Sequence, residues 1–372
     1  MKFLIITHVP HKKQDNHWFA YAPYVREMNI WLKHVDEVTI VAPMVSGTIS
    51  DIDLAYQHRD ITFTQIPSIE FTSIATIIRS LFKLPIIFLR LYKACQKADH
   101  IHLRCPGNIG LLGCLVQIFF PKTPKTAKYA GNWDPNAKQP LSYKVQKWLL
   151  SNTSLTKNMQ VLVYGHWEHQ TRNVKSFFTA TYHATEIEKP MERNYSGPLQ
   201  CIFVGSLVKG KRPLLAIQII EALHKQGKQV SLDIYGDGVL KEILYRYIAD
   251  NKLETIVSLH GNQSQDRIKA SLKQAHFLIL ASKSEGWPKA IAEAMFFGAI
   301  PIATPISCVP YMLDYGRRGI LITPNVDETI VTIHEALKTE DLKTMSKLGS
   351  EWSQQFTLDY FEAEIKNILI RS

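Results

Sequence analysis

Short runs of β-branched residues alternate with longer helical patterns along most of the chain, and this alternation limits the possible folds more than any other feature. In the first half, strands are expected at 2–9, 37–42, 61–66, 100–104, 126–130 and 160–163. Helical patterns lie between them, at 19–33, 73–96, 108–120 and 141–150. Strands that alternate with helices in this way form parallel βαβ units, so the sequence predicts an α/β fold.

The second half repeats the alternation more clearly. Strands are expected at 200–204, 230–235, 256–260, 276–281 and 299–303. Helices are expected at 213–226, from just after residue 238 to about residue 249, at 265–275, at 289–297 and over the last 20 residues. The strand at 276–281 is so apolar that both of its faces must be covered, as in the centre of a doubly wound sheet.

The length of 372 residues suits two domains, each with its own core. The segment 188–199 loses periodicity and gathers Pro, Gly, Asn and Ser, which is typical of a domain boundary. We therefore expect a first domain at 1–190, a second at 200–350, and a C-terminal helix at 351–372 that packs back on the first domain.

Cysteine usage and hydropathy indicate the cellular compartment. The five cysteines include no C-x-x-C pair, so neither a disulfide framework nor a zinc site is indicated, and the cytosol fits best. Residues 1–11 are typical of a first strand and lack a signal-peptide cleavage site. The longest apolar stretch, 74–95, is interrupted by charged residues and proline, and falls short of the roughly 20 apolar residues that span a bilayer.

The net charge of +10 lies almost wholly in the first half. Residues 1–199 hold 23 Lys and Arg against 14 Asp and Glu, whereas residues 200–372 hold 20 against 19. This asymmetry indicates an anionic partner. The cations of 79–93 are interleaved with Leu, Ile and Phe, which favours an anionic membrane surface over nucleic acid, for which no recognition motif is present. A buried helix pair with a charged solvent edge explains the same pattern equally well.

Ligands of parallel sheets bind beyond the carboxyl ends of the strands, which directs attention to three loops. The loop 205–213 holds two glycines and three cations before a helix start, and this composition suits a phosphate, although a solvated basic loop is an equal alternative. The loop 236–238 (GDG) is best interpreted as a tight turn when taken alone.

The third loop carries two carboxylates at a fixed spacing. Glu285 follows the buried strand, Pro288 starts a helix, and Glu293 comes eight residues after Glu285 among apolar neighbours. An ordinary surface salt bridge between Lys289 and Glu293 is the alternative, since they are four residues apart on a helix. The strand context and the second carboxylate favour a functional site.

Residues 285–295 (EGWPKAIAEAM) resemble the E-x7-E signature of the retaining group 1 glycosyltransferases, which have the GT-B fold. The resemblance covers the second half in the family's order: GSLVKGKRP, GDG, LHG, E-x7-E and GAIPIAT. It implies two Rossmann-like, doubly wound domains that face a central cleft. It also implies a UDP- or GDP-linked sugar as the donor substrate and no cofactor. No cluster with metal-ligand spacing appears, so we expect a metal-independent site.

Carried over by position, the resemblance implies that Glu285 contacts the hydroxyls of the donor sugar and that Lys211 neutralises the diphosphate. These two residues are the candidate catalytic pair. Glu293 would bind the ribose, and Asn262 would lie beside the nucleobase. The remaining candidates for donor binding are Gly205, Ser206, Lys209, Arg212, Gly236, Gly286, Trp287, Pro288 and Lys289.

The sequence departs from the family pattern in three places. Ser206 stands where the family usually has arginine, so Lys209, Lys211 or Arg212 must neutralise the phosphate. The N-terminal loop 8–18 lacks the usual glycines, and the segment 131–135 replaces a usual histidine. The candidate acceptor-side residues are therefore His8, His11, Asn132 and Asp134.

The resemblance implies a hexosyltransferase, and it alone implies that the anomeric configuration is retained. The expected acceptor is a glycan or a lipid-linked saccharide in cell-envelope polysaccharide synthesis, at the cytoplasmic face of the membrane. Two alternatives stay open. A GT-B nucleotide-sugar epimerase would consume the donor without an acceptor, and a non-catalytic nucleotide-binding or membrane-docking subunit would bind nucleotide without turnover.

Overall fold

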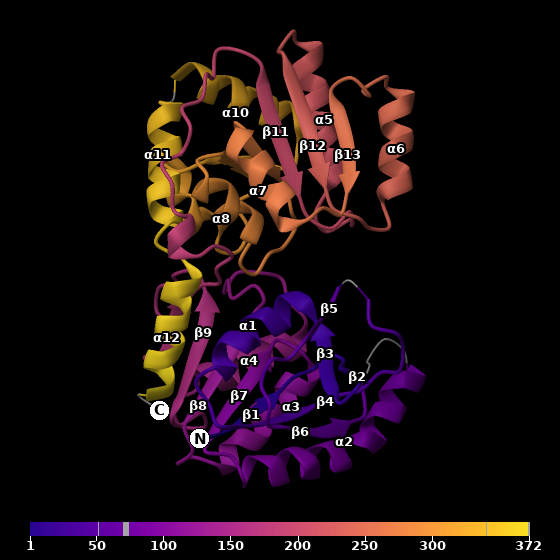
Figure 1. Ribbon diagram of the computed structural model, residues 1–372, viewed down its shortest axis with the longest axis vertical. Coiled ribbons are helices and arrows are strands. Elements are labelled where there is room, and N and C mark those ends of the chain that lie inside the picture. Colours follow the sequence, from indigo (N-terminus) through magenta and orange to yellow (C-terminus); the bar gives the residue numbers. More distant parts are fainter. Residues whose placement is uncertain (51, 70–73, 340, 371–372) are drawn as a thin grey trace. The chain divides into compact units, whose positions relative to one another are not determined.

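The chain forms two compact units, as seen in a computed structural model that describes residues 1–50, 52–69, 74–339 and 341–370 (Figure 1). Unit 1 comprises Met1–Phe178 together with the segment that starts at Phe361, and unit 2 comprises Thr179–Tyr360. The chain therefore passes into unit 2 before the segment 188–199, which sequence reasoning took as the boundary. Within the described ranges, no helix is both long and apolar enough to cross a bilayer.

Unit 1 is built on a parallel seven-stranded sheet with the order β10-β9-β8-β7-β1-β4-β6. Its strands are short and mostly buried, as the β-branched runs predict. Their bounds are β1 (Lys2–Ile6), β4 (Glu37–Pro43), β6 (Ile61–Ile66), β7 (His100–Cys105), β8 (Lys125–Tyr129), β9 (Met159–Tyr164) and β10 (Val174–Phe177).

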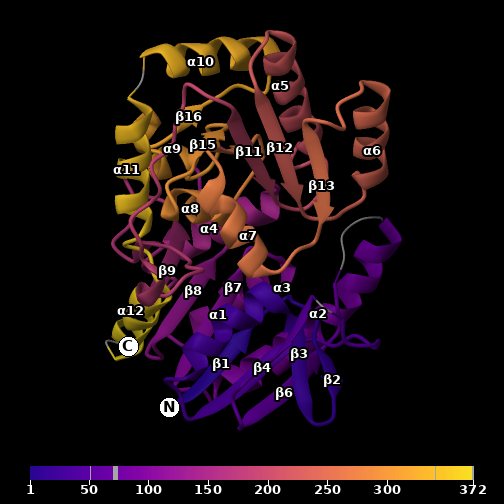
Figure 2. The ribbon, with the colours of Figure 1, turned by 45° about the horizontal axis from the view of Figure 1, so that its top comes forward.

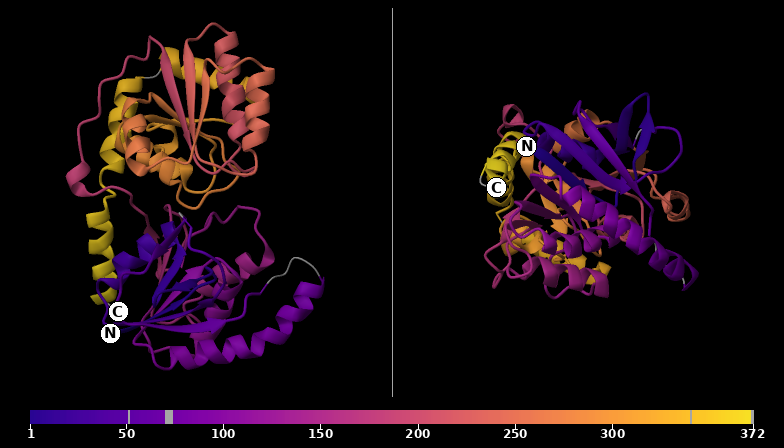
Figure 3. Two further views of the ribbon diagram at one scale, coloured as in Figure 1. Left: turned by 45° about the vertical axis from the view of Figure 1, so that its right-hand side comes forward. Right: turned by 90° about the horizontal axis from the view of Figure 1, so that it is seen from below.

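The helices of unit 1 form two layers. The connection from β1 to β4 contains α1 (Ala22–Leu32), and the connections back through β7, β8 and β9 contain α2 (Ile74–Cys95), α3 (Asn108–Val116) and α4 (Leu141–Ser151). Since these connections run in opposite directions along the sheet and crossovers are right-handed, α1 covers one face and α2, α3 and α4 cover the other. Figure 3 shows α2, in violet, alongside this sheet. Residue 73, the first of the helix expected at 73–96, lies outside the described residues.

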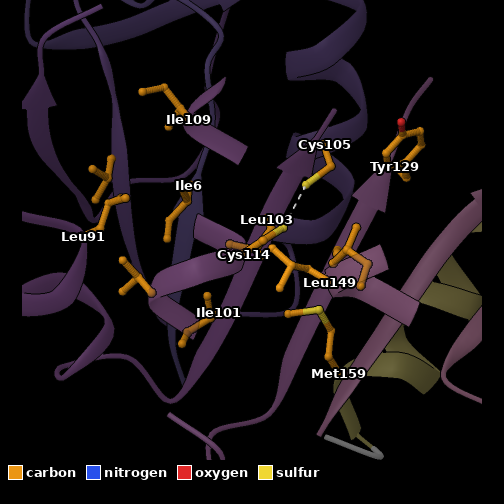
Figure 4. Packing of buried hydrophobic residues seen from close by; sticks show 14 of the residues in the cluster. Ile6, Leu91, Ile101, Leu103, Cys105, Ile109, Cys114, Tyr129, Leu149 and Met159 are labelled. Atoms are coloured by element: carbon orange, nitrogen blue, oxygen red, sulfur yellow. Dashed lines mark hydrogen bonds between the residues drawn. The ribbon is translucent and has the colours of Figure 1, made fainter. Parts of the chain in front are cut away.

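The core of unit 1 joins the sheet to this three-helix layer (Figure 4). Ile6 and Leu103 project from β1 and β7 against Leu91 of α2 and Cys114 of α3, all fully buried. The thiols of Cys105 and Cys114 lie 3.9 Å apart, Sγ to Sγ. Apolar side chains recur at the strand period on the sheet and at the helical period on the helices, and together they form this core.

A small antiparallel sheet was missed by the sequence interpretation. It consists of β2 (Lys12–Gln14), β3 (His17–Tyr21) and β5 (Asp53–Ala55), so the helix expected at 19–33 begins three residues late, at Ala22. Asp15 and Asn16 form the two-residue turn between β2 and β3 with φ of 47° and 62°. Asp and Asn tolerate positive φ, and two such residues in succession are a hairpin signal.

Unit 2 is built on a parallel six-stranded sheet with the order β13-β12-β11-β14-β15-β16. The strands are β11 (Leu199–Val204), β12 (Val230–Tyr235), β13 (Val257–Gly261), β14 (Phe277–Leu280), β15 (Ile300–Ala303) and β16 (Ile320–Leu321). The strand order reverses between β11 and β14, and such a switch point is where open parallel sheets bind ligands.

Helices cover both faces of this sheet. Figure 2 shows β11, β12 and β13 side by side with α5 (Pro213–Lys225) and α6 (Lys241–Asp250) next to them. The opposite face carries α7 (Gln265–Gln274), α8 (Lys289–Phe296) and α11 (Leu342–Ser353), while α10 (Val326–Thr339) packs on α5 and the short α9 (Val309–Met312) follows β15.

The helix expected near the C-terminus is α12 (Leu358–Ile370). From Phe361 onward it belongs to unit 1, where the buried ring of Phe361 packs 5.6 Å from Phe177 and 5.7 Å from Phe178, centroid to centroid. The carboxylate of Glu362 pairs with Lys33 at 2.8 Å. Unit 1 is thus completed by a helix that follows unit 2 in the sequence.

Candidate active site

The loops after β11 and β14 lie against each other at the switch point of unit 2. Lys283 N–H donates to the carbonyl of Gly210 over 2.8 Å, and the guanidinium of Arg212 donates to the carbonyl of Ala281 over 3.2 Å. The basic loop 205–213 and the loop that carries Glu285 are therefore joined in one site, as their positions after neighbouring strands require.

Lys211 and Glu285 form the closest contact between these loops. Lys211 Nζ lies 2.5 Å from Glu285 Oε1, and the Glu285 side chain is 8% exposed against 29% for Lys211. A charge-assisted bond of this kind holds both groups in place. The pair sets a cation for a diphosphate beside a carboxylate that can accept hydrogen bonds from sugar hydroxyls.

The other polar residues of the basic loop have different surroundings. Arg212 adopts a left-handed backbone (φ 50°) just before α5, and its guanidinium faces carbonyl oxygens, so it braces the loop. Lys209 and Ser206 are exposed. Lys209 and Lys211 are therefore the cations of this loop best placed to meet a phosphate.

Gly236 brings a third loop against the first. It has φ of 136°, and a Cβ atom at this position would lie 2.0 Å from the carbonyl oxygen of Gly205. The N–H of Gly205 donates to Tyr235 over 2.9 Å, and that of Gly236 donates to Gly261 over 2.8 Å. The loop at 236–238 is thus more than a solvent turn, because it packs directly against the predicted phosphate loop.

Two distant segments hold the backbone of 286–288. The carbonyl of Gly286 accepts a bond from Cys308 Sγ over 3.0 Å, and the indole of Trp287 stacks on Trp352 with ring centroids 6.0 Å apart. Pro288 precedes the first residue of α8 and has no N–H. Pro288 therefore cannot supply a backbone N–H for the phosphate contact that the resemblance implies for this turn.

Glu293 lies on the second turn of α8 and is half-buried. Its Oε1 accepts a bond from Thr181 Oγ1 over 2.7 Å. Burial raises the pKa of the Glu293 carboxyl, and the Thr181 bond and the charge of Lys289 oppose this to a smaller extent. Glu293 also lines a small pocket with Thr181, Trp287 and Phe356.

Asn262 follows the glycine at the end of β13, and its side chain is exposed. Beside it, His260 stacks on Tyr235 at 4.7 Å and its Nε2 lies 2.6 Å from Asp233 Oδ1. Asn262 therefore lies at the same carboxyl edge as the loops above, two strands from β11.

The candidate acceptor-side residues lie in unit 1, after the carboxyl ends of β1 and β8. His11 is fully buried, its Nε2 bonds Tyr56 OH over 2.8 Å, and burial lowers its pKa to about 4. His8 is exposed beside Gly107, where an added Cβ would come within 2.7 Å of its Nδ1. His8 can therefore meet a ligand, whereas His11 serves the interior.

Asn132 and Asp134 shape the turn after β8. The side chain of Asn132 accepts a bond from the N–H of Asp134 over 2.8 Å, and that of Asp134 accepts one from the N–H of Asn136 over 2.8 Å. Their side-chain oxygens are thus engaged with local backbone, as in Asx turns.

Sequence reasoning missed several residues that support these loops. Thr181, Cys308 and Trp352 each lie far in sequence from their partners at 285–293. Nothing in their local sequence signals a role, because their contribution depends on tertiary placement.

Comparison with known proteins finds relatives of the part of the chain that holds this site. Residues 184–352 match the family model described as glycosyl transferases group 1, and this part of the chain belongs to that family. Over 172 residues the chain is 26% identical to the putative colanic acid biosynthesis glycosyltransferase WcaL of Salmonella typhimurium, an alignment that covers 42% of each protein. Over 138 residues it is 26% identical to the GDP-mannose:cellobiosyl-diphosphopolyprenol alpha-mannosyltransferase of Xanthomonas oryzae pv. oryzae, covering 37% of this chain and 36% of that protein.

The chain aligns with only about two-fifths of the length of these relatives. Structural similarity extends further, since Anabaena HepE in complex with UDP and glucose superimposes with a TM-score of 0.66 at 13% identity over 99% of both chains. The chain therefore has a GT-B-like fold with two parallel α/β sheets, as the sequence predicted.

Proposed function

We propose that this protein transfers a hexose from a UDP- or GDP-linked donor to a glycan or lipid-linked acceptor, with retention and without a metal ion. The observation that carries the proposal is the Lys211–Glu285 pair at the switch point of unit 2, where Lys211 Nζ and Glu285 Oε1 are 2.5 Å apart. The pair joins the two loops whose sequences resemble the donor-binding loops of the family.

The charge distribution suits departure of a nucleoside diphosphate. That step builds negative charge on the phosphate and positive charge at the anomeric carbon, and preorganised opposite charges lower the barrier. Lys211 and Lys209 would face the phosphate together with backbone N–H groups at Gly286, Trp287 and Lys289. Glu285 would accept hydrogen bonds from the sugar and orient it.

The remaining donor contacts follow the same plan. Glu293 and Asn262 would hold the ribose and the base, while the close packing of Gly236 on Gly205 would hold the phosphate loop in place. Retention of configuration is inferred from the family alone. The acceptor side is proposed at the carboxyl edge of unit 1, with His8 as its exposed polar residue.

The proposed setting is envelope polysaccharide synthesis in the cytoplasm. Support comes from the name of the WcaL relative and from the five cysteines, all of which are buried free thiols suited to a reducing compartment. The name of the Xanthomonas relative specifies a diphosphopolyprenol-linked acceptor, and we propose the same class here.

The proposal is tested by incubating the protein with UDP-glucose or GDP-mannose and a diphosphopolyprenol-linked saccharide, and measuring nucleotide release and labelled product. Glu285→Ala is expected to lower transfer by about 100-fold or more, the usual effect of losing one preorganised polar group at a reacting centre. Glu254→Ala, at an exposed position of unit 2, is the matched control and should keep full activity.

Three outcomes would contradict the proposal. Equal activity of Glu285→Ala and the natural protein would remove the assigned role of Glu285. Conversion of the donor without any acceptor would indicate an epimerase. Nucleotide binding, seen as a raised melting temperature, with no turnover of any donor would indicate a nucleotide-binding subunit.

A further inference from the structure

The outer surface of the α2–α3–α4 layer of unit 1 exposes large apolar side chains from three separate elements. On α2 these are Leu81, Phe82, Ile86 and Leu89, with 53%, 82%, 43% and 47% exposure. Soluble proteins rarely gather so many exposed apolar side chains in one layer unless the surface binds something.

The exposed residues of α2 follow the helical repeat. Arg79, Phe82, Ile86, Leu89 and Lys93 recur at intervals of three and four, so they lie on one face of the helix, and all five are exposed. The apolar residues occupy the middle of this stripe and a cation stands at each end. Ile87 and Leu91, on the opposite face of α2, are fully buried in the core.

The stripe continues onto neighbouring elements. Phe119, 60% exposed at the end of the short 3-10 helix Gln117–Phe119, packs against Phe88 of α2 with ring centroids 6.0 Å apart. Next to α3, α4 exposes Leu141, Val145 and Trp148, again at helical spacing. We call these exposed residues of α2, of the 3-10 helix and of α4 the apolar face.

The charge around the apolar face is almost entirely positive. Residues 74–157, which form this layer and strands beneath it, contain 13 Lys and Arg, of which Lys125 and Lys128 are buried, but only two acids, Asp99 and Asp134. Exposed cations accompany the apolar side chains: Arg79 and Lys93 lie on α2, Lys144 lies on α4, and Lys97 and Lys138 lie in the loops next to these helices. A protein partner would need an acidic, apolar surface of its own, whereas an anionic bilayer supplies negative charge and an apolar interior together.

We propose that the apolar face docks unit 1 on an anionic lipid surface. Phe82, Ile86, Leu89 and Phe119 would insert at the boundary between headgroups and acyl chains, and Trp148 would lie at headgroup depth, as tryptophan does at membrane interfaces. Arg79, Lys93 and Lys144 would face lipid phosphates. The docking needs neither donor nor acceptor, so it stands or falls separately from the proposed transferase activity.

The test is cosedimentation of the full-length protein with vesicles of phosphatidylcholine alone or with about 30% phosphatidylglycerol, at low and high salt. We expect binding to the anionic vesicles, weak binding to the neutral ones, and weaker binding as salt rises. The double variant Phe82→Ser/Leu89→Ser should bind at least about tenfold more weakly, because it removes several inserted carbon atoms.

A second double variant, Arg79→Gln/Lys93→Gln, should lose roughly tenfold or more in affinity for the anionic vesicles only, since each cation near such a surface contributes about fivefold. Ile370→Ser, at a 70% exposed position of α12 outside the apolar face, is the matched control and should bind like the natural protein. Melting temperatures show whether each variant is folded.

Three results would overturn the inference. The first is failure of the natural protein to bind anionic vesicles, and the second is equal binding by Phe82→Ser/Leu89→Ser. The third is a dimer in light scattering that this double variant abolishes, without vesicle binding, because the apolar face would then bind a second copy of the chain.

Discussion

Glycine at position 236 decides how closely two loops of the site can pack. Its φ of 136° is unfavourable for other residues, and the space for a Cβ is already filled by the carbonyl of Gly205. Gly210, in the same basic loop, has nothing within 4 Å of the position its Cβ would occupy. Two glycines near one site thus differ fully in the reason for their presence.

We expect Gly236→Ala to destabilise unit 2 by about 3 kcal/mol, the combined effect of a strained backbone and a clash with main chain. Gly210→Ala should change stability by less than about 0.5 kcal/mol. Urea unfolding of both variants measures the difference. Equal stability of the two variants would show that the approach of Gly236 to Gly205 is not needed.

At the residue scale, sequence alone could nominate Lys211 and Glu285, because both follow strands and match family motifs. It could not assign His11, whose burial beneath Tyr56 depends on a small sheet that pairs Lys12 with Phe19 and Phe19 with Ala55. Nor could it find Thr181 and Cys308, which contact Glu293 and Gly286 only after the chain has folded.

At the scale of one element, β7 illustrates how an apolar strand can hold titratable groups. His100 and His102 are fully buried, and both rings bond Thr126 Oγ1, at 3.0 Å and 2.8 Å. Their rings also stack on Phe3 of β1. Burial lowers the pKa of His100 to about 3 and that of His102 well below its usual value.

These pKa shifts predict acid sensitivity of unit 1. Both histidines stay neutral in the folded protein but take up protons near pH 6.5 in the unfolded chain. The free energy of unfolding is therefore highest above that pH and falls as the pH drops below it. Each histidine should lower the free energy of unfolding by about 1.4 kcal/mol between pH 7.5 and pH 5.5. His102→Phe should therefore reduce the fall in unfolding free energy over this range by about that amount, as measured by urea unfolding at both pH values. An unchanged fall would contradict the assigned protonation states.

The strands and helices of the two parallel α/β units were predictable, because their apolar residues recur at the spacing of a strand or of a helix. The small antiparallel sheet was not, because β2 and β5 are three residues each and their pairing is set by a turn at Asp15 and Asn16. Periodicity needs a longer window than such strands provide.

For the whole molecule, the division into two units predicts two separable unfolding steps. Phe361→Ala should lower the free energy of unfolding of unit 1 by about 3–5 kcal/mol, since the ring is fully buried against Phe177 and Phe178. UDP should raise the transition temperature of unit 2, because all the candidate donor-binding residues lie within 179–360. Calorimetry with and without UDP tests both effects, and a single transition moved equally by both changes would show that the units unfold together.

The return of α12 to unit 1 also has a consequence for how the protein is made. Domains generally fold in the order in which the ribosome releases them. Here Phe361 and Glu362 emerge only after residues 179–360 have been synthesised, so unit 2 can reach its native state while unit 1 still lacks one helix. A premature stop codon shortly before position 361 would therefore damage the half of the protein that was translated first.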